Sequence, residues 1–300
     1  MIKFVNISKT YDFEDAVKNV NLKLEEGKIY GLIGRSGAGK TTLLKILSNQ
    51  IARFDGKIVW KGEDVFENQK LVEEIIYVSD DMDFMSTNGN QTPDKIFNTA
   101  SKLYKHWDSE FAYYLIKEFD LDIYKGIKSL SKGYRTIVNL ILGLASRGEI
   151  TIFDEPSNGL DANNRYKFYK ILMEDIEDNP RTVFISTHII DEIENVLEEV
   201  IIIKEGEIIL HEELLEIQEK AWMFTGKAEV LEALNDKNIV YRDKIGSLSV
   251  VGIYDKFSPE LWSNLKNQGV DVGAISLQNL LIYMTDEEYK NEQSIELPIK

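Results

Sequence analysis

The chain of 300 residues carries 35 lysines and arginines against 51 aspartates and glutamates, which gives a formal net charge of −16. So acidic a chain repels the phosphates of nucleic acids, and DNA and RNA are therefore not expected partners. The sequence has no cysteine, which excludes disulfides, thiolate nucleophiles and thiolate metal sites and favours a reducing compartment.

Short apolar runs alternate with helical patterns over about the first two thirds of the chain. Runs rich in β-branched residues occur at 28–34, 149–154, 182–187 and 199–206. Between them, apolar residues recur with helical spacing, as in Ile137, Leu140, Ile141 and Leu144. This alternation predicts an α/β fold with a mainly parallel sheet covered by helices. The runs are too short to span a bilayer, and the polar amino terminus does not indicate a secretory signal.

A glycine-rich loop at residues 34–41, GRSGAGKT, matches the pattern G-x-x-x-x-G-K-[ST] between a predicted strand and a predicted helix. Its glycines let the backbone curl so that N–H groups face an anion, and the helix amino terminus adds a favourable dipole. Lys40 is expected to hold the β- and γ-phosphates, and Thr41 to bind Mg²⁺. A chance match somewhere in the chain has a probability of roughly 1%. The predicted nucleotide-binding residues of this loop are Gly34, Arg35, Ser36, Gly37, Ala38, Gly39, Lys40, Thr41 and Thr42.

Residues 82 to about 146 contain several helical patterns and no strand-like run, which predicts a helical insert. Thr92 and Pro93 are a plausible cap and first residue of one of its helices. After residue 216 the pattern changes to short alternating strands at 248–254 and 270–276 between helical segments at 228–236 and 259–267. We therefore expect a core domain at 1–216 and a small α+β domain at 217–300.

Two carboxylates end the apolar run in ITIFDEPSNGLD, residues 150–161. In an acidic protein such a pair is usually a solvated strand end. At the carboxyl end of a parallel strand, however, it would face the same edge of the sheet as the glycine-rich loop. Asp154 is then expected to complete the Mg²⁺ shell and Glu155 to polarise the attacking water.

Three further segments follow the glycine-rich loop in a fixed order: LSKGY at 130–134, SNGLDA at 157–162 and STH at 186–188. Over about residues 1–216, the ordered set resembles the nucleotide-binding subunit of ATP-binding cassette (ABC) transporters. The resemblance implies a P-loop NTPase core with an antiparallel N-terminal β subdomain. It also implies ATP and Mg²⁺ as cofactors.

The resemblance assigns roles to individual residues. Ser131 and Gly133 would bind the γ-phosphate held by the opposite subunit, although LSKG alone reads as a helix cap. His188 would contact the γ-phosphate and help to hold Glu155, the alternative being a structural histidine. Asp161 would communicate across the dimer. Tyr11 would stack on adenine, and an exposed turn tyrosine is the competing interpretation.

Three positions depart from the family pattern. Asp80 stands where the family usually has glutamine, and it is still expected to bind Mg²⁺. Lys132 replaces a glycine and Tyr134 a glutamine of the usual LSGGQ segment. These changes leave two hypotheses: an active ATPase, or a regulatory subunit that binds ATP with little or no hydrolysis.

The resemblance also implies an assembly. Two copies, or this chain and a paralogous ATPase, would sandwich two Mg-ATP, and the helical insert would receive a helix of an integral-membrane permease. The chain would then be cytoplasmic, peripheral at the cytoplasmic face of the cell membrane. Its segments look most like ATPases of Gram-positive exporters of antimicrobial or amphipathic peptides, including phenol-soluble modulin exporters. A chromosome-maintenance ATPase would carry a long coiled coil before LSKGY, which this sequence lacks.

Overall fold

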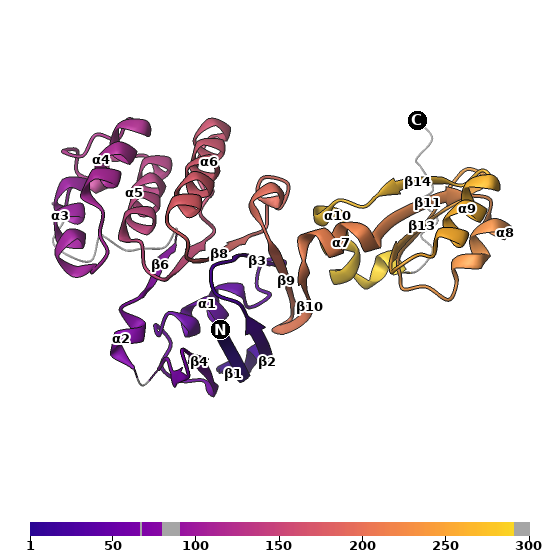
Figure 1. Cartoon of the computed structure of the whole chain (residues 1–300), viewed down its shortest axis with the longest axis horizontal. Helices are drawn as coiled ribbons and strands as arrows, with labels where there is room; N and C mark the ends of the chain where they lie inside the picture. The colour runs from indigo at the N-terminus through magenta and orange to yellow at the C-terminus, as the bar shows by residue number, and fades with distance from the viewer. Residues whose placement is uncertain (67, 80–90, 291–300) are drawn as a thin grey trace. The chain divides into compact units, whose positions relative to one another are not determined.

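The computed structural model describes residues 1–66, 68–79 and 91–290, which form two compact units (Figure 1). The first unit comprises Met1–His188 and Asn195–His211, and the second comprises Ile189–Glu194 and Glu212–Lys300. The division expected near residue 216 falls inside helix α7, Leu214–Lys220, which belongs to the second unit. Within the described ranges, every helix is too short or too polar to cross a membrane.

A six-stranded sheet with the order β10-β9-β3-β8-β7-β6 forms the centre of the first unit. β3 pairs in parallel with β9 and β8, and β7 pairs in parallel with β8 and β6, which confirms the mainly parallel sheet. β3, β7 and β8 are buried along their whole length, as their continuous apolar sequences require. The strands are β3 (Ile29–Ile33), β6 (Ile75–Ser79), β7 (Ile150–Asp154), β8 (Thr182–Thr187), β9 (Glu199–Lys204) and β10 (Glu207–Glu213).

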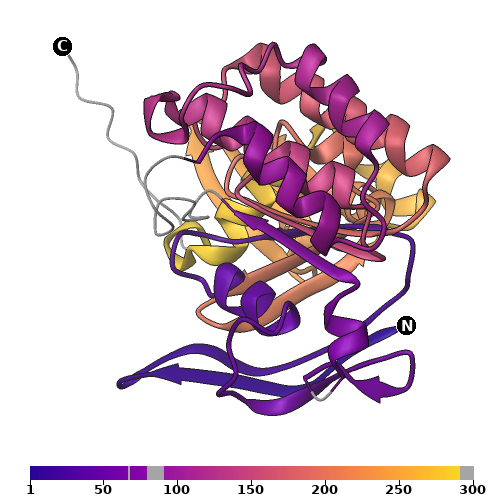
Figure 2. The same ribbon diagram turned by 90° about the vertical axis from the view of Figure 1, so that its left-hand side faces the viewer.

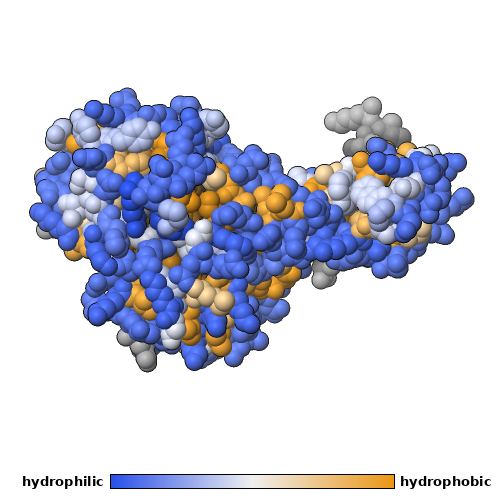
Figure 3. All heavy atoms as spheres, viewed as in Figure 1, coloured by the Kyte–Doolittle hydropathy of each residue, from blue (hydrophilic) through white to orange (hydrophobic). Residues whose placement is uncertain are grey.

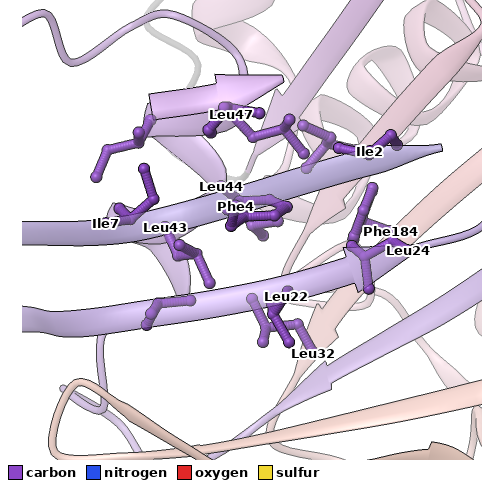
Figure 4. Close-up of a cluster of buried hydrophobic side chains, with 14 of the residues drawn as sticks. Ile2, Phe4, Ile7, Leu22, Leu24, Leu32, Leu43, Leu44, Leu47 and Phe184 are labelled. Carbon is purple, nitrogen blue, oxygen red and sulfur yellow. The ribbon is translucent and has the colours of Figure 1, made fainter. Parts of the chain in front are cut away.

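A second sheet, with the order β2-β1-β4-β5, is antiparallel where its pairing is defined and confirms the expected N-terminal β subdomain. Its strands are β1 (Ile2–Tyr11), β2 (Glu14–Leu24), β4 (Asp55–Trp60) and β5 (Glu63–Asp64). Alternate residues such as Ile2, Phe4, Leu22 and Leu24 point inward, where they join Leu43, Leu44 and Leu47 of helix α1, Lys40–Leu47 (Figure 4). This shared apolar core fixes the helix that follows the glycine-rich loop.

The helices of residues 93–178 gather on one side of the first unit, away from the antiparallel sheet (Figures 1 and 2). Thr92 caps α3 and Pro93 is its first residue, as predicted. Asp108 and Ser131 cap the next two long helices in the same way. α5 packs against α3, α4 and β6, so the insert is anchored to the edge of the parallel sheet. The helices are α2 (Gln69–Val72), α3 (Pro93–Leu103), α4 (Ser109–Glu118), α5 (Lys132–Ser146) and α6 (Ala162–Asp178).

The second unit confirms the predicted α+β composition and adds a specific topology. After α7 its elements run β-α-β-β-α-β, and the antiparallel sheet has the order β12-β13-β11-β14. This is the split βαβ, or ferredoxin-like, arrangement. Phe224, Val251, Ile253 and Leu265 form the centre of its core. The elements are β11 (Ala221–Gly226), α8 (Ala228–Leu231), β12 (Ile239–Ile245), β13 (Leu248–Tyr254), α9 (Pro259–Asn267), β14 (Asp271–Ala274) and α10 (Leu277–Thr285).

Hydrophilic residues dominate the face of the molecule drawn in Figure 3, and apolar residues appear there in smaller patches. The apolar content of the sequence, 43%, is thus largely used for the internal cores described above.

Candidate functional site

The glycine-rich loop joins β3 to α1 and forms the wall of a cavity of about 350 Å³. Gly37 and Gly39 have φ values of 82° and 106°, in the left-handed region that favours glycine. At Gly39 a Cβ atom would lie 2.3 Å from the carbonyl oxygen of Ala16, so this position also needs glycine for space. The lining residues are Ala16, Ser36, Gly37, Ala38, Gly39, Lys40, Thr41, Thr42 and Glu155.

Seven of the nine predicted loop residues line this cavity, and the other two, Gly34 and Arg35, are hydrogen-bonded to Lys40. The Lys40 ammonium donates to the carbonyl oxygens of Gly34 at 2.8 Å and Arg35 at 3.2 Å. Ala16, on β2, was not predicted, because its place in the wall depends on the close approach of two sheets rather than on a local pattern. The loop is therefore a preformed, partly cationic cradle.

Lys40 is buried, and its ammonium lies 3.9 Å from the Glu155 carboxylate. Burial lowers the pKa of Lys40, whereas the nearby carboxylates of Glu155 and Asp154 act in the opposite direction. A buried cation at a cavity wall is suited to an anionic ligand that replaces its lost hydration.

Asp154 is the last residue of β7, and both oxygens of its carboxylate accept hydrogen bonds. The Tyr77 hydroxyl donates to Oδ2 at 2.8 Å, and the Ser186 hydroxyl donates to Oδ1. Only 3% of Asp154 is exposed. Sequence analysis assigned no role to Tyr77, or to Ser186 within the STH segment. The two residues lie in the strands on either side of β7.

Glu155 follows directly and has a φ of 53°. Its backbone N–H donates to the carbonyl oxygen of Ser186 at 3.0 Å. Its side chain meets His188, whose Nδ1 lies 2.9 Å from Oε2. Lys40, Glu155 and His188 thus come together at one end of β3, β7 and β8, where the sequence placed them.

The remaining predicted residues lie elsewhere in the first unit. Tyr11 ends β1, is half-exposed and carries the Lys9 ammonium over its ring at 4.6 Å. Ser131 accepts from the Tyr134 N–H at 3.3 Å as the cap of α5. Asp161 caps α6 by accepting from the Asn164 N–H at 2.8 Å.

Gly133 is packed against the loop after β7, since a Cβ atom there would lie 2.7 Å from the carbonyl oxygen of Gly159. Thr136, one turn further along α5, donates to the carbonyl oxygen of Asn158 at 2.8 Å. The segments LSKGY and SNGLDA are therefore in direct contact. Neither Tyr11, Ser131, Gly133 nor Asp161 lines the cavity, and Asp80 lies outside the described residues.

The available donors fit a hard cation that arrives with phosphate. In the described part of the chain, no cluster of three or more histidine, aspartate or glutamate side chains could hold a metal by itself. Thr41, at the cavity wall, and the buried carboxylate of Asp154 supply only oxygen atoms. Mg²⁺ is usually held by one or two carboxylates together with substrate phosphates, so the donor set suits it.

A parallel sheet with a glycine-rich loop, a buried lysine and carboxylates at the adjacent strand end defines a P-loop nucleoside triphosphatase. The family model described as "ABC transporter" matches residues 17–158. Residues 17–158 thus correspond to an ABC transporter ATP-binding domain, a domain of P-loop ATPases.

Individual relatives agree with this assignment. The chain is 25% identical over 282 residues to the ABC transporter ATP-binding protein YtrB of Bacillus subtilis, covering 88% of this chain and 94% of the relative. It is 28% identical over 223 residues to the lantibiotic transport ATP-binding protein SrtF of Streptococcus pyogenes, covering 71% and 91%. Among solved structures, the dimeric post-hydrolysis state of the ATP-binding cassette MJ0796 with ADP and Pi matches with a TM-score of 0.60 and 25% identity, covering 71% and 99%.

Proposed function

We propose that this chain hydrolyses Mg-ATP to power export through a separate integral-membrane permease. The observation that carries the hydrolytic part is a chain of three side chains: Lys40 and Glu155 line the cavity, and His188 contacts Glu155. The Lys40 ammonium lies 3.9 Å from the Glu155 carboxylate, which lies 2.9 Å from the His188 ring. A cation for phosphate, a carboxylate for water and a group that orients that carboxylate are what phosphoryl transfer to water requires.

Each group has a defined task in this proposal. Backbone N–H groups of the loop and the Lys40 ammonium bind the phosphates. Thr41 and Asp154 would hold Mg²⁺, which neutralises phosphate charge when it is bound. Glu155 takes up the proton of the attacking water, and His188 keeps the Glu155 carboxylate oriented and contacts the γ-phosphate.

A second ATPase subunit, either a copy of this chain or a paralogue, is proposed to complete each site. Ser131 is exposed at the amino terminus of α5, where a helix favours anions. Since neither it nor Gly133 lines the cavity of its own chain, both are suited to the γ-phosphate held by the partner. The dimeric form of the MJ0796 relative supports this arrangement. Asp161, at the start of α6, is assigned to communication across the dimer, and Tyr11 to stacking on adenine.

Export of peptides or amphipathic antimicrobial compounds is the proposed task. The name of the Streptococcus pyogenes relative, which refers to lantibiotic transport, supports the cargo class. The exposed helical insert is the proposed contact with the permease, which would hold the chain peripherally at the cytoplasmic face of the membrane.

The test of hydrolysis is the ATPase rate of the purified chain as a function of its own concentration. We expect the rate per chain to rise with concentration, because each site needs two subunits. Glu155→Gln should keep ATP binding and lower turnover by about 100-fold or more. Glu149→Gln is the matched control, since Glu149 precedes the same strand at its opposite end and pairs with Lys61 at 2.5 Å. Full turnover by Glu155→Gln would refute the assignment of the base.

The regulatory hypothesis makes the opposite prediction for the unaltered chain. Lys132 and Tyr134 alter the segment that would face the partner's γ-phosphate, and the aliphatic part of Lys132 lies beside Gly159. ATP binding without turnover, at every protein concentration and with the permease present, would favour this second function over the first.

A further inference from the structure

We infer that Tyr77 and Ser186 are positioning residues that hold Asp154 for its metal, and that Ser186 also sets the backbone of Glu155. The inference rests on the proposed Mg-ATP site and adds to it two residues to which the sequence assigns no role: Tyr77, and Ser186 at the start of the STH segment. Both are buried, with Tyr77 on β6 and Ser186 on β8.

The strand order brings the two hydroxyls to opposite sides of one carboxylate. β7 lies between β6 and β8, and Asp154 is the register partner of Ser79 on one side and Ser186 on the other. Tyr77 is two residues before Ser79 and therefore shares its face of the sheet. Its long side chain reaches forward along that face, and its hydroxyl lies 2.8 Å from Asp154 Oδ2.

The pair of donors restricts rotation of the Asp154 carboxylate. Each carboxylate oxygen has two lone pairs, and Tyr77 and Ser186 occupy one on Oδ2 and one on Oδ1. One lone pair on each oxygen is left for a cation. Donors that orient a ligand in this way typically change metal affinity by about 10- to 100-fold when they are removed.

Ser186 has a second connection that Tyr77 lacks. Its hydroxyl oxygen accepts from the Glu155 backbone N–H at 3.2 Å while its proton goes to Asp154. Its carbonyl oxygen accepts from the same N–H at 3.0 Å. The hydroxyl therefore joins the metal-binding carboxylate to the residue that acts on water, and it supports Glu155 at its φ of 53°.

The two residues predict different defects. Tyr77→Phe removes one donor and keeps the ring, so metal affinity should fall by about 10-fold with little change in kcat. Ser186→Ala should weaken metal binding to a similar extent and also lower kcat, because Glu155 loses a hydrogen bond. Ser186→Thr keeps a hydroxyl and should restore both properties in large part.

The first readout is Mn²⁺ binding, measured by the loss of the free-ion electron paramagnetic resonance signal when protein is added to Mn²⁺ and ATP. All variants carry Glu155→Gln so that ATP is not consumed. ATP affinity in EDTA, measured with a fluorescent analogue, should be equal in all of them. The second readout, without Glu155→Gln, is turnover against Mg²⁺ concentration, where Tyr77→Phe should shift the half-maximal concentration upward.

Tyr30→Phe is the matched control. Tyr30 is also a buried tyrosine of the parallel sheet, but its hydroxyl donates to the Glu25 carbonyl oxygen at 3.1 Å, away from Asp154. It should leave Mn²⁺ affinity unchanged. Unchanged Mn²⁺ affinity in Tyr77→Phe overturns the inference. A loss of ATP affinity in EDTA as large as the loss of Mn²⁺ affinity in that variant also overturns it. If the unaltered chain binds Mn-ATP without turnover, only the hydrolytic proposal fails; if it binds no Mn-ATP, both fail.

Discussion

The backbone of Glu155 adopts an energetically unfavourable conformation. A φ of 53° is unusual for a side chain other than glycine and costs of order 1–3 kcal/mol. The bond from its N–H to Ser186 and the contact with His188 offset part of this cost. The sharp backbone turn after the buried Asp154 lets two adjacent carboxylates serve different partners: hydroxyl groups on one side, Lys40 and His188 on the other.

At Lys40 the structure predicts a pH dependence of ATP binding. Burial lowers the pKa of Lys40 below the ordinary lysine value of about 10.4. Without ATP, the Lys40 ammonium therefore loses its proton at a lower pH than an ordinary lysine. ATP prefers the charged ammonium, and its affinity should therefore decline as pH rises through that lowered pKa. The measurement is ATP affinity from neutral pH to about pH 10. Lys40→Met should bind weakly and lack the alkaline decline, and an identical decline in that variant would assign it to another group.

Among the elements, α5, α6 and β8 are joined by a buried acidic residue. Asp175 of α6 lies 2.9 Å from the Arg147 guanidinium, at the end of α5, and 2.7 Å from that of Arg181, just before β8. Arg181 and Asp175 are each 5% exposed, so these charges depend on one another rather than on water.

Asp175→Asn should lower the free energy of unfolding of the first unit by about 3 kcal/mol, because it leaves the buried Arg181 without its countercharge, whereas Arg147 keeps its ion pair with Asp108. Asp178→Asn, at the exposed end of the same helix, should change it by less than about 0.5 kcal/mol. Urea unfolding followed by far-UV circular dichroism measures both. Equal stabilities of the two variants would show that the ion pairs contribute nothing net.

How much the sequence could predict depends on whether a feature is local. The loop at 34–41, the cap Ser131 and the strand ending at Asp154 are visible as short patterns, and the structure contains each of them. Tyr77 and Ser186 acquire their meaning only from the order β6-β7-β8, which pairs segments far apart in the chain. The ferredoxin-like topology was likewise out of reach, because β11 lies between β13 and β14 and neither neighbour follows it directly.

At the scale of the whole molecule, the negative charge bears on how the chain would associate with a membrane. A chain of net charge −16 is not attracted by anionic lipid headgroups, so its attachment should depend on a protein partner. We expect the chain to sediment with membranes of cells that contain the permease and to be released by alkaline carbonate.

Fractionation of cells with and without the permease gene checks this expectation. Removal of the permease should shift the chain to the supernatant, and high salt alone should release little of it if the contact is mainly apolar. Equal membrane association in both strains would contradict the proposed partner.

α5 connects the helical insert to Ser131. Its 15 residues span about 22 Å, and it is buried from Thr136 onward. Ser131 lies at one end, Arg147 is held by ion pairs at the other, and α3 and α4 pack along its side. Because α5 also packs against β6 and β7, a displacement of the helix would have to change its packing on the parallel sheet. A displacement of the insert would then move Ser131, which is proposed to contact the nucleotide of another subunit. Conversely, binding of that nucleotide to Ser131 would displace the insert.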